Sequence, residues 1–286
     1  MPIWVTWSPT LKASLVLGAL AILAPACGGS DDEADGMRSP AGSVPAAGER
    51  HTADRPDEKT GPQIHLMYVL PADGADQELD IDGTVAASFG AAEGWLSGQT
   101  GGRTLRLDTF EGEPDISFIT LSRPDDDVQA EGAFGRDLIE GELREAGFDS
   151  AEKVYAVYYD GGSTYACGSG AYPPRIVGNV AVLWLHGLPL SGAIRCGDNE
   201  FAEGGDDAGF WEYVAVHEIM HTLGFVPTCS PNETLDGHIS GPANDLMYEG
   251  EEESDLPKAL DAGNDDYYRT DIVGCPDFED SPYLTP

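Results

Sequence analysis

The sequence predicts an α+β fold in which a twisted mixed β-sheet is backed by helices. Three observations support this prediction. Strand-like and helix-like apolar patterns alternate along the chain, the strand-like segments are rich in β-branched and aromatic residues, and residues 63–286 have the length and apolar content of one domain.

The first expected elements are a strand, a helix and two more strands. Residues 63–70 place isoleucine, leucine and tyrosine at alternate positions, which predicts a strand. Residues 81–98 repeat valine, phenylalanine, alanine and tryptophan at helical spacing. Leucines alternate with polar residues in 104–110, and 116–121 is a short β-forming run, so each predicts a strand.

The order continues with a helix, two strands and a final helix. Residues 132–147 repeat apolar residues at helical spacing and stop at a glycine, which is typical of a helix end. Residues 153–159 and 177–185 are strong β-forming runs. The last helix is expected around residues 214–223, and irregular structure follows it.

This last helix contains the most informative motif of the chain. His217 and His221 are four residues apart, so a helix places both imidazoles on one face, where they can bind one metal ion. Glu218 lies beside the first histidine and can act on a metal-bound water as general base and acid. Apolar neighbours indicate a buried helix, in which such side chains are rare without partners. The motif therefore predicts a zinc peptidase.

From His217 the sequence reads HExxHxxG, which resembles the metzincin clan of zinc endopeptidases. The resemblance covers residues 210–250. In that clan the third ligand is usually a histidine three residues beyond the glycine, but that position here is Pro227. The resemblance also implies that an antiparallel edge strand binds the substrate, for which residues 180–185 are the nearest candidate.

His238 is the preferred third zinc ligand because it is the only histidine that follows the helix. Asp236 and Asp245 are the alternatives, since some clan members use an aspartate. Residues 244–248 resemble the metzincin Met-turn, in which Met247 would form the hydrophobic floor beneath the zinc. The segment thus reads as a metzincin-like site with an insertion before the third ligand.

Two other functions stay open. A zincin of another family would use a carboxylate such as Glu249 or Asp245 as its third ligand. A non-catalytic metal-binding envelope lipoprotein is the second alternative. Glu218 argues against it, because structural zinc sites are closed by four protein ligands and need no base.

The N-terminus carries the features of an export signal. A single lysine precedes an apolar run of twelve residues, 13–24, which is too short to span a bilayer but typical of a signal peptide. Small residues followed by Cys27 resemble a bacterial lipobox, which predicts a signal peptide at 1–26 and a lipid on Cys27. An ordinary secretory leader cut near Ala26 is the alternative. Residues 27–62 lack large apolar side chains and are expected to form a disordered tether to the membrane of the cell envelope.

The remaining four cysteines are an even number, as expected in an oxidising compartment. Three pairings are open. The favoured one joins Cys167 to Cys196 and Cys229 to Cys275.

The charge excludes one class of partner and suggests a second metal. With 51 acidic and 15 basic residues, nucleic acid is not expected as a partner, whereas a peptide or protein substrate is. A monomer is expected. Acidic clusters can also bind Ca²⁺, although none has EF-hand spacing. They are Asp73 with Asp76, Asp80 with Asp82, and Glu251 to Glu253.

Overall fold

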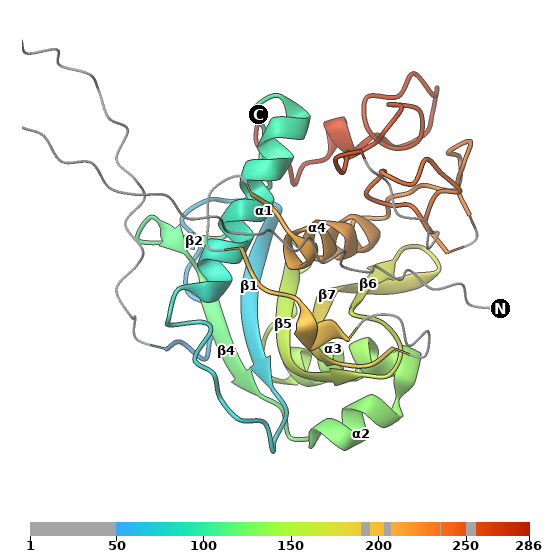
Figure 1. The fold of residues 1–286 in the computed structure, drawn as a ribbon. Helices are drawn as coiled ribbons and strands as arrows, with labels where there is room; N and C mark the ends of the chain where they lie inside the picture. The colour runs from blue at the N-terminus through green and yellow to red at the C-terminus, as the bar shows by residue number, and fades with distance from the viewer. Residues whose placement is uncertain (1–49, 190–194, 203–206, 235, 250–255) are drawn as a thin grey trace, which may run out of the picture.

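The computed structural model describes residues 50–189, 195–202, 207–234, 236–249 and 256–286. Its centre is a five-stranded sheet with the strand order β4-β1-β5-β7-β6, as Figure 1 shows. Neighbouring strands are parallel, except that β6 is antiparallel to β7. The strands are β1 (Gln63–Leu70), β2 (Thr109–Phe110), β3 (Glu113–Pro114), β4 (Ile116–Thr120), β5 (Lys153–Ser163), β6 (Gly168–Tyr172) and β7 (Ile176–Gly187), and the helices are α1 (Thr84–Thr100), α2 (Asp125–Ala130), α3 (Gly135–Glu145) and α4 (Phe210–Thr222), with short 3-10 turns η1 (Gly132–Phe134), η2 (Cys196–Asp198) and η3 (Phe278–Asp280).

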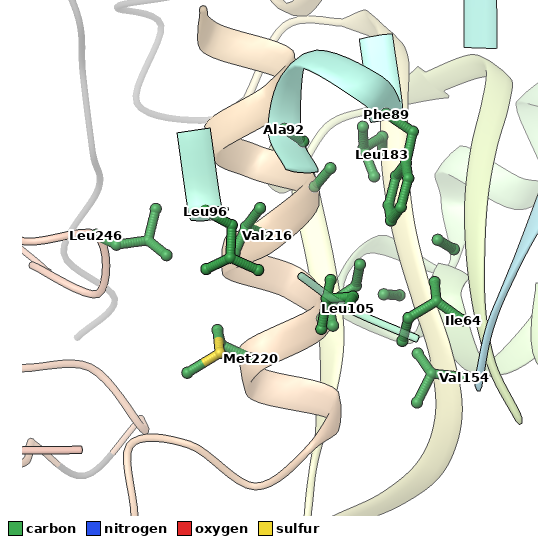
Figure 2. Packing of buried hydrophobic residues seen from close by; sticks show 14 of the residues in the cluster. Ile64, Phe89, Ala92, Leu96, Leu105, Val154, Leu183, Val216, Met220 and Leu246 are labelled. Carbon is green, nitrogen blue, oxygen red and sulfur yellow. The ribbon is translucent and has the colours of Figure 1, made fainter. Parts of the chain in front are cut away.

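Helices cover both faces of the sheet. In β1, Leu66 and Tyr68 belong to the core beneath α1 and α4, whereas Met67 and Val69 belong to the core beneath α2 and α3. This alternation follows from the two-residue period of a strand, and both sets are apolar because both faces are buried. Figure 2 shows Val216 of α4 beside Leu96 of α1. The predicted mixed sheet with helices is present, and its layout is a three-layer α/β arrangement rather than a sheet covered on one side.

Most predicted elements are present close to their expected bounds. Strand β1 has the predicted bounds, and β4, β5 and β7 lie where strands were expected, with β5 and β7 longer. The expected strand at 104–110 is wrong, because only Thr109 and Phe110 form one. Leu105 and Leu107 instead form isolated bridges to Leu284 and Ile64, so Leu105 is buried and Leu107 half-buried without a continuous ladder. Neither α2 nor the glycine-rich β6 was predicted from the sequence.

Residues 50–62, expected to belong to the tether, pack against the domain. Arg50 forms ion pairs with Asp76 and Asp80, and His51 forms a bridge with Ser117 beside the edge strand β4. Lys153 binds the carboxylates of residues 54 and 57 at 2.6 Å. The folded part of the described chain therefore includes residues 50–62, and composition missed this because the partners are distant in sequence. The predicted signal peptide, Cys27 and the rest of the tether lie outside the described residues.

Two disulfides fasten the loops around α4. They join Cys167 to Cys196 and Cys229 to Cys275, which are the pairs favoured from the sequence. Such bonds persist in extracellular or periplasmic compartments. Within the described ranges, no helix has both the length and the apolar composition needed to cross a membrane.

Candidate metal centre

Helix α4 supplies three of the side chains at the candidate site. Its first turn is fixed by the buried Glu212, whose carboxylate accepts a hydrogen bond from the backbone N–H of Gly209 at 2.9 Å. The helix ends before Gly224, which has a φ of 87°, a left-handed conformation that favours glycine. His217, Glu218 and His221 therefore lie on a helix with defined ends, as the sequence predicts.

His238 brings a third imidazole to the same point from the loop after α4. Its Nε2 lies 3.2 Å from Nε2 of His217 and 3.1 Å from Nε2 of His221. If Zn–N bonds are about 2.0–2.1 Å, two ligand nitrogens of a tetrahedral ion are about 3.3 Å apart. The three nitrogens are therefore arranged as a zinc ion requires.

Hydrogen bonding and charge both fit a cation at this point. Nδ1 of His217 donates to the carbonyl of Leu246 at 2.8 Å, which leaves the lone pair of its Nε2 free for a metal. Burial, followed by repulsion from His238, lowers the pKa of His217 to about 3. Burial lowers the pKa of His238 to about 4, and the pKa of His221 lies well below its usual value for the same reason. All three rings are then neutral at pH 7, and their Nε2 atoms lie close together.

Glu218 lies beside this group, beneath the edge strand β6. It is only 7% exposed, and burial raises its pKa to about 8, although the backbone of Gly170 opposes the shift. A Cβ atom at Gly168 would lie 2.3 Å from its Oε1, and one at Gly170 would lie 2.5 Å from its carbonyl oxygen. Strand β6 can pass this close to α4 only because both positions are glycine.

The same strand corrects the expected substrate-binding edge. Residues 180–185 belong to β7, which is an interior strand paired with both β5 and β6. The antiparallel edge strand is β6. Glycine-rich segments have low β-propensity, and so the sequence did not indicate this strand.

Met247 is fully buried in a turn beside His238. Its carbonyl accepts a hydrogen bond from Ile239, the residue after His238, at 2.9 Å. The turn is therefore joined directly to the loop that presents the third imidazole, at the place where the sequence predicted a Met-turn.

Among the described residues, this group consists of the three histidines. It does not include the alternative third ligands, Asp236, Asp245 and Glu249. Asp245 points elsewhere, because its two carboxylate oxygens accept hydrogen bonds from Met247 and Ala262. Burial raises the pKa of Asp245 to about 7, and these donors act in the opposite direction. Asp236 is exposed. The geometry favours His238 over Asp236, Asp245 and Glu249.

A second buried polar cluster was not foreseen from the sequence. Nδ1 of His65 lies 2.7 Å from Asp108, and its Nε2 lies 3.0 Å from Oγ of Ser117. The order Ser, His, Asp is that of a serine hydrolase, but all three side chains are fully buried. Lys153 also donates to Asp108 at 2.7 Å, which balances the carboxylate. These contacts hold β1, β4 and β5 together and leave no access for a substrate.

The carboxylates proposed for calcium have other partners. Asp76 and Asp80 bind Arg50, Asp73 accepts from the backbone of residue 125, and Asp82 accepts from the backbone of residue 84. Glu251 to Glu253 lie outside the described residues. None of the described carboxylates in these clusters is left without a partner, so they do not need a calcium ion.

Compared with models of protein families, the chain matches none, and no curated protein matches it in sequence. Among solved structures, it is similar to metalloproteinase-II from Bacteroides fragilis, with 16% identity and a TM-score of 0.32. The match covers 75% of this chain and 54% of that protein, so the chain spans about half of its length. At this distance, any functional conclusion depends on the geometry of the site.

Proposed function

We propose that the protein is an exported, lipid-anchored zinc metalloendopeptidase of metzincin type in which His217, His221 and His238 hold the zinc. The observation that supports this most directly is the convergence of three neutral imidazole nitrogens beside a buried carboxyl group. Three protein ligands leave one coordination position open, as catalytic zinc sites require.

The chain's own groups account for the proton transfers. Zinc, when bound, acts as a Lewis acid and lowers the pKa of a coordinated water towards about 7. His217, His221 and His238 would hold the ion, and Glu218 would accept a proton from the attacking water and return it to the leaving amine. Burial raises the pKa of Glu218 to about 8 in the metal-free site, and a bound cation would lower it again towards the ionised form that a general base needs. Gly168 and Gly170 keep room for this side chain.

The test combines metal content with peptide hydrolysis. We expect the purified chain to contain one zinc per molecule by elemental analysis and to cleave unfolded casein, and we expect a chelator to abolish cleavage. Glu218→Gln should retain the zinc and lose roughly 100- to 10,000-fold in kcat, because it removes the base and no ligand.

A half-buried glutamate of α1, Glu93, provides the matched control. Burial raises the pKa of Glu93 to about 7, but its side chain binds the backbone of Leu105, away from the histidines. Glu93→Gln should keep full turnover. Active, unchelated protein without zinc would exclude the proposal, and zinc-loaded protein that cleaves no peptide would favour the non-catalytic lipoprotein.

The location and the assembly are proposals of the same kind. We propose that Cys27 carries the lipid after removal of residues 1–26, that the protein works as a monomer on peptide substrates, and that nucleic acid is not a partner. The two disulfides agree with an oxidising compartment. Mass spectrometry of the native protein should find a modified N-terminal Cys27. An unmodified N-terminus at another residue would refute the anchor.

A further inference from the structure

We infer that Asp245 is a positioning residue for the metal centre, through which residues 259–267 hold the turn at Met247 and the two histidines joined to it. This inference rests on the proposed function, since it assigns a role within that site. Asp245 does not touch the three imidazole nitrogens, so its effect on them passes through the backbone.

Asp245 joins two segments that are separate in sequence. Its side chain is fully buried, and Oδ1 accepts hydrogen bonds from the backbone N–H of Met247 and from the hydroxyl of Tyr267, both at 2.8 Å. Oδ2 accepts from the backbone N–H of Ala262 at 2.7 Å. One carboxylate therefore fastens the turn to residues 262 and 267.

The turn passes this restraint to two of the three histidines. The carbonyl of Leu246 accepts the hydrogen bond from Nδ1 of His217, while the N–H of Leu246 donates to Ala259 at 2.8 Å. The carbonyl of Met247 accepts from Ile239, next to His238. The orientation of one ligand ring and the path of the other ligand's loop thus depend on the turn that Asp245 holds.

Only a carboxylate satisfies this arrangement. Three donors converge on two acceptor oxygens, and an asparagine has one oxygen and an NH₂ group that would face a donor. Asp245→Asn keeps the volume of the side chain and breaks at least one of the three bonds. Partners that orient metal ligands typically change metal affinity by about 10- to 100-fold when they are lost.

The experiment measures zinc affinity by competition with a chelator, together with the absorption spectrum of the cobalt-substituted protein. We expect Asp245→Asn to bind zinc about 10- to 100-fold more weakly and to show an altered cobalt spectrum. Tyr267→Phe removes one donor and keeps the carboxylate, so it should cause a smaller loss of affinity in the same direction.

Asp160→Asn is the matched control. Asp160 is buried like Asp245 and also accepts from three donors. Its donors are the side chains of Tyr68, Gln77 and His186, and none of them belongs to the metal site. It should lower the melting temperature of the metal-free protein without changing zinc affinity or the cobalt spectrum.

The outcomes separate this inference from the proposed function. Wild-type protein that binds no zinc overturns the proposed function itself. If the wild type binds zinc and Asp245→Asn binds it equally well, only the role of Asp245 is wrong. If Asp245→Asn does not fold, Tyr267→Phe decides, because unchanged zinc affinity and an unchanged cobalt spectrum in that variant overturn the inference.

Discussion

Among the described residues, two clusters of polar side chains are built around histidine, and they differ in the groups that surround the imidazole rings. In the cluster of His65, hydrogen bonds link the ring to Asp108 and Ser117, and Lys153 supplies the opposite charge. In the cluster of His217, His221 and His238, the three Nε2 atoms lie close together beside Glu218, and Nδ1 of His221 is buried without a hydrogen-bond partner.

The comparison distinguishes a candidate metal site from a network of hydrogen bonds that stabilises the fold. A buried polar group is costly unless it has partners. In the cluster of His65, both ring nitrogens and Oδ2 of Asp108 have partners, whereas Oδ1 of Asp108 has none. Imidazole nitrogens that converge without a carboxylate among them form a group that can bind a cation. Serine, histidine and aspartate at suitable distances do not by themselves make an active site, and the group of three histidines is the candidate metal site.

The largest expected effect is the loss of a zinc ligand. His238→Ala should weaken zinc binding by roughly 1,000-fold, because each ligand contributes a few kcal/mol of a total of about 10–16 kcal/mol in zinc sites. Peptidase activity should fall with it while the fold survives. Chelator competition and circular dichroism measure the two outcomes. Near-normal zinc in His238→Ala, with loss of zinc in Asp236→Ala, would assign the third ligand to Asp236.

Breaking the cluster of His65 should instead lower the free energy of unfolding. Lys153→Met leaves the buried Asp108 without its cation, and such changes destabilise proteins by about 3–5 kcal/mol. Urea unfolding of the metal-free protein measures this, and zinc affinity should be unchanged. Lys59→Met, at an exposed position, is the control and should alter stability by less than about 0.5 kcal/mol. Equal stability of the two variants would contradict the account.

The clusters should also respond to acid in different pH ranges. The pKa values of His217 and His238 are lower in the folded protein than in the unfolded chain, which therefore binds more protons between pH 6.5 and about 4. The free energy of unfolding of the metal-free protein should fall as the pH drops through this range. The hydrogen bonds from His65 and Lys153 outweigh burial and lower the pKa of Asp108, so its contribution is lost only below about pH 4. Urea unfolding at several pH values checks this, and a flat profile between pH 6.5 and 4 would count against it.

The smallest expected effect is at Ser117. Ser117→Ala removes one hydrogen bond to His65 and should cost about 1 kcal/mol of stability. Turnover of peptide substrates and reactivity towards a fluorophosphonate should not change, because the serine is fully buried. Labelling of Ser117 by the fluorophosphonate would show that the cluster is accessible after all.

Local patterns were enough to predict much of the fold. Residues 63–70 and α4 have strong apolar periodicity, and the structure has them at or near the expected positions. His238 was preferred because it is the only histidine after α4. The disulfide pairs were one of three pairings left open, and the structure has the favoured one.

The rest depends on contacts between distant segments. In β6, Glu218 of α4 occupies the space that a side chain at Gly168 would need. This requirement cannot be predicted from β6 alone, because it depends on the neighbouring helix. Residues 50–62 looked like a tether because their ion-pair partners lie as far along the chain as Lys153. Asp245 was a candidate ligand by composition, and only the positions of Ala262 and Tyr267 reveal what its oxygens bind.

The link between Asp245 and residues 262 and 267 also makes the candidate metal centre depend on one of the last segments of the chain to be synthesised. Chains are synthesised from the N-terminus, so α4 and His238 leave the ribosome before the segment that fastens the turn beside them. Before Tyr267 and Cys275 are synthesised, the hydrogen bond from Tyr267 to Asp245 and the disulfide to Cys229 cannot form. We therefore expect the metal centre to reach its full affinity only after this segment has docked on the turn at Met247.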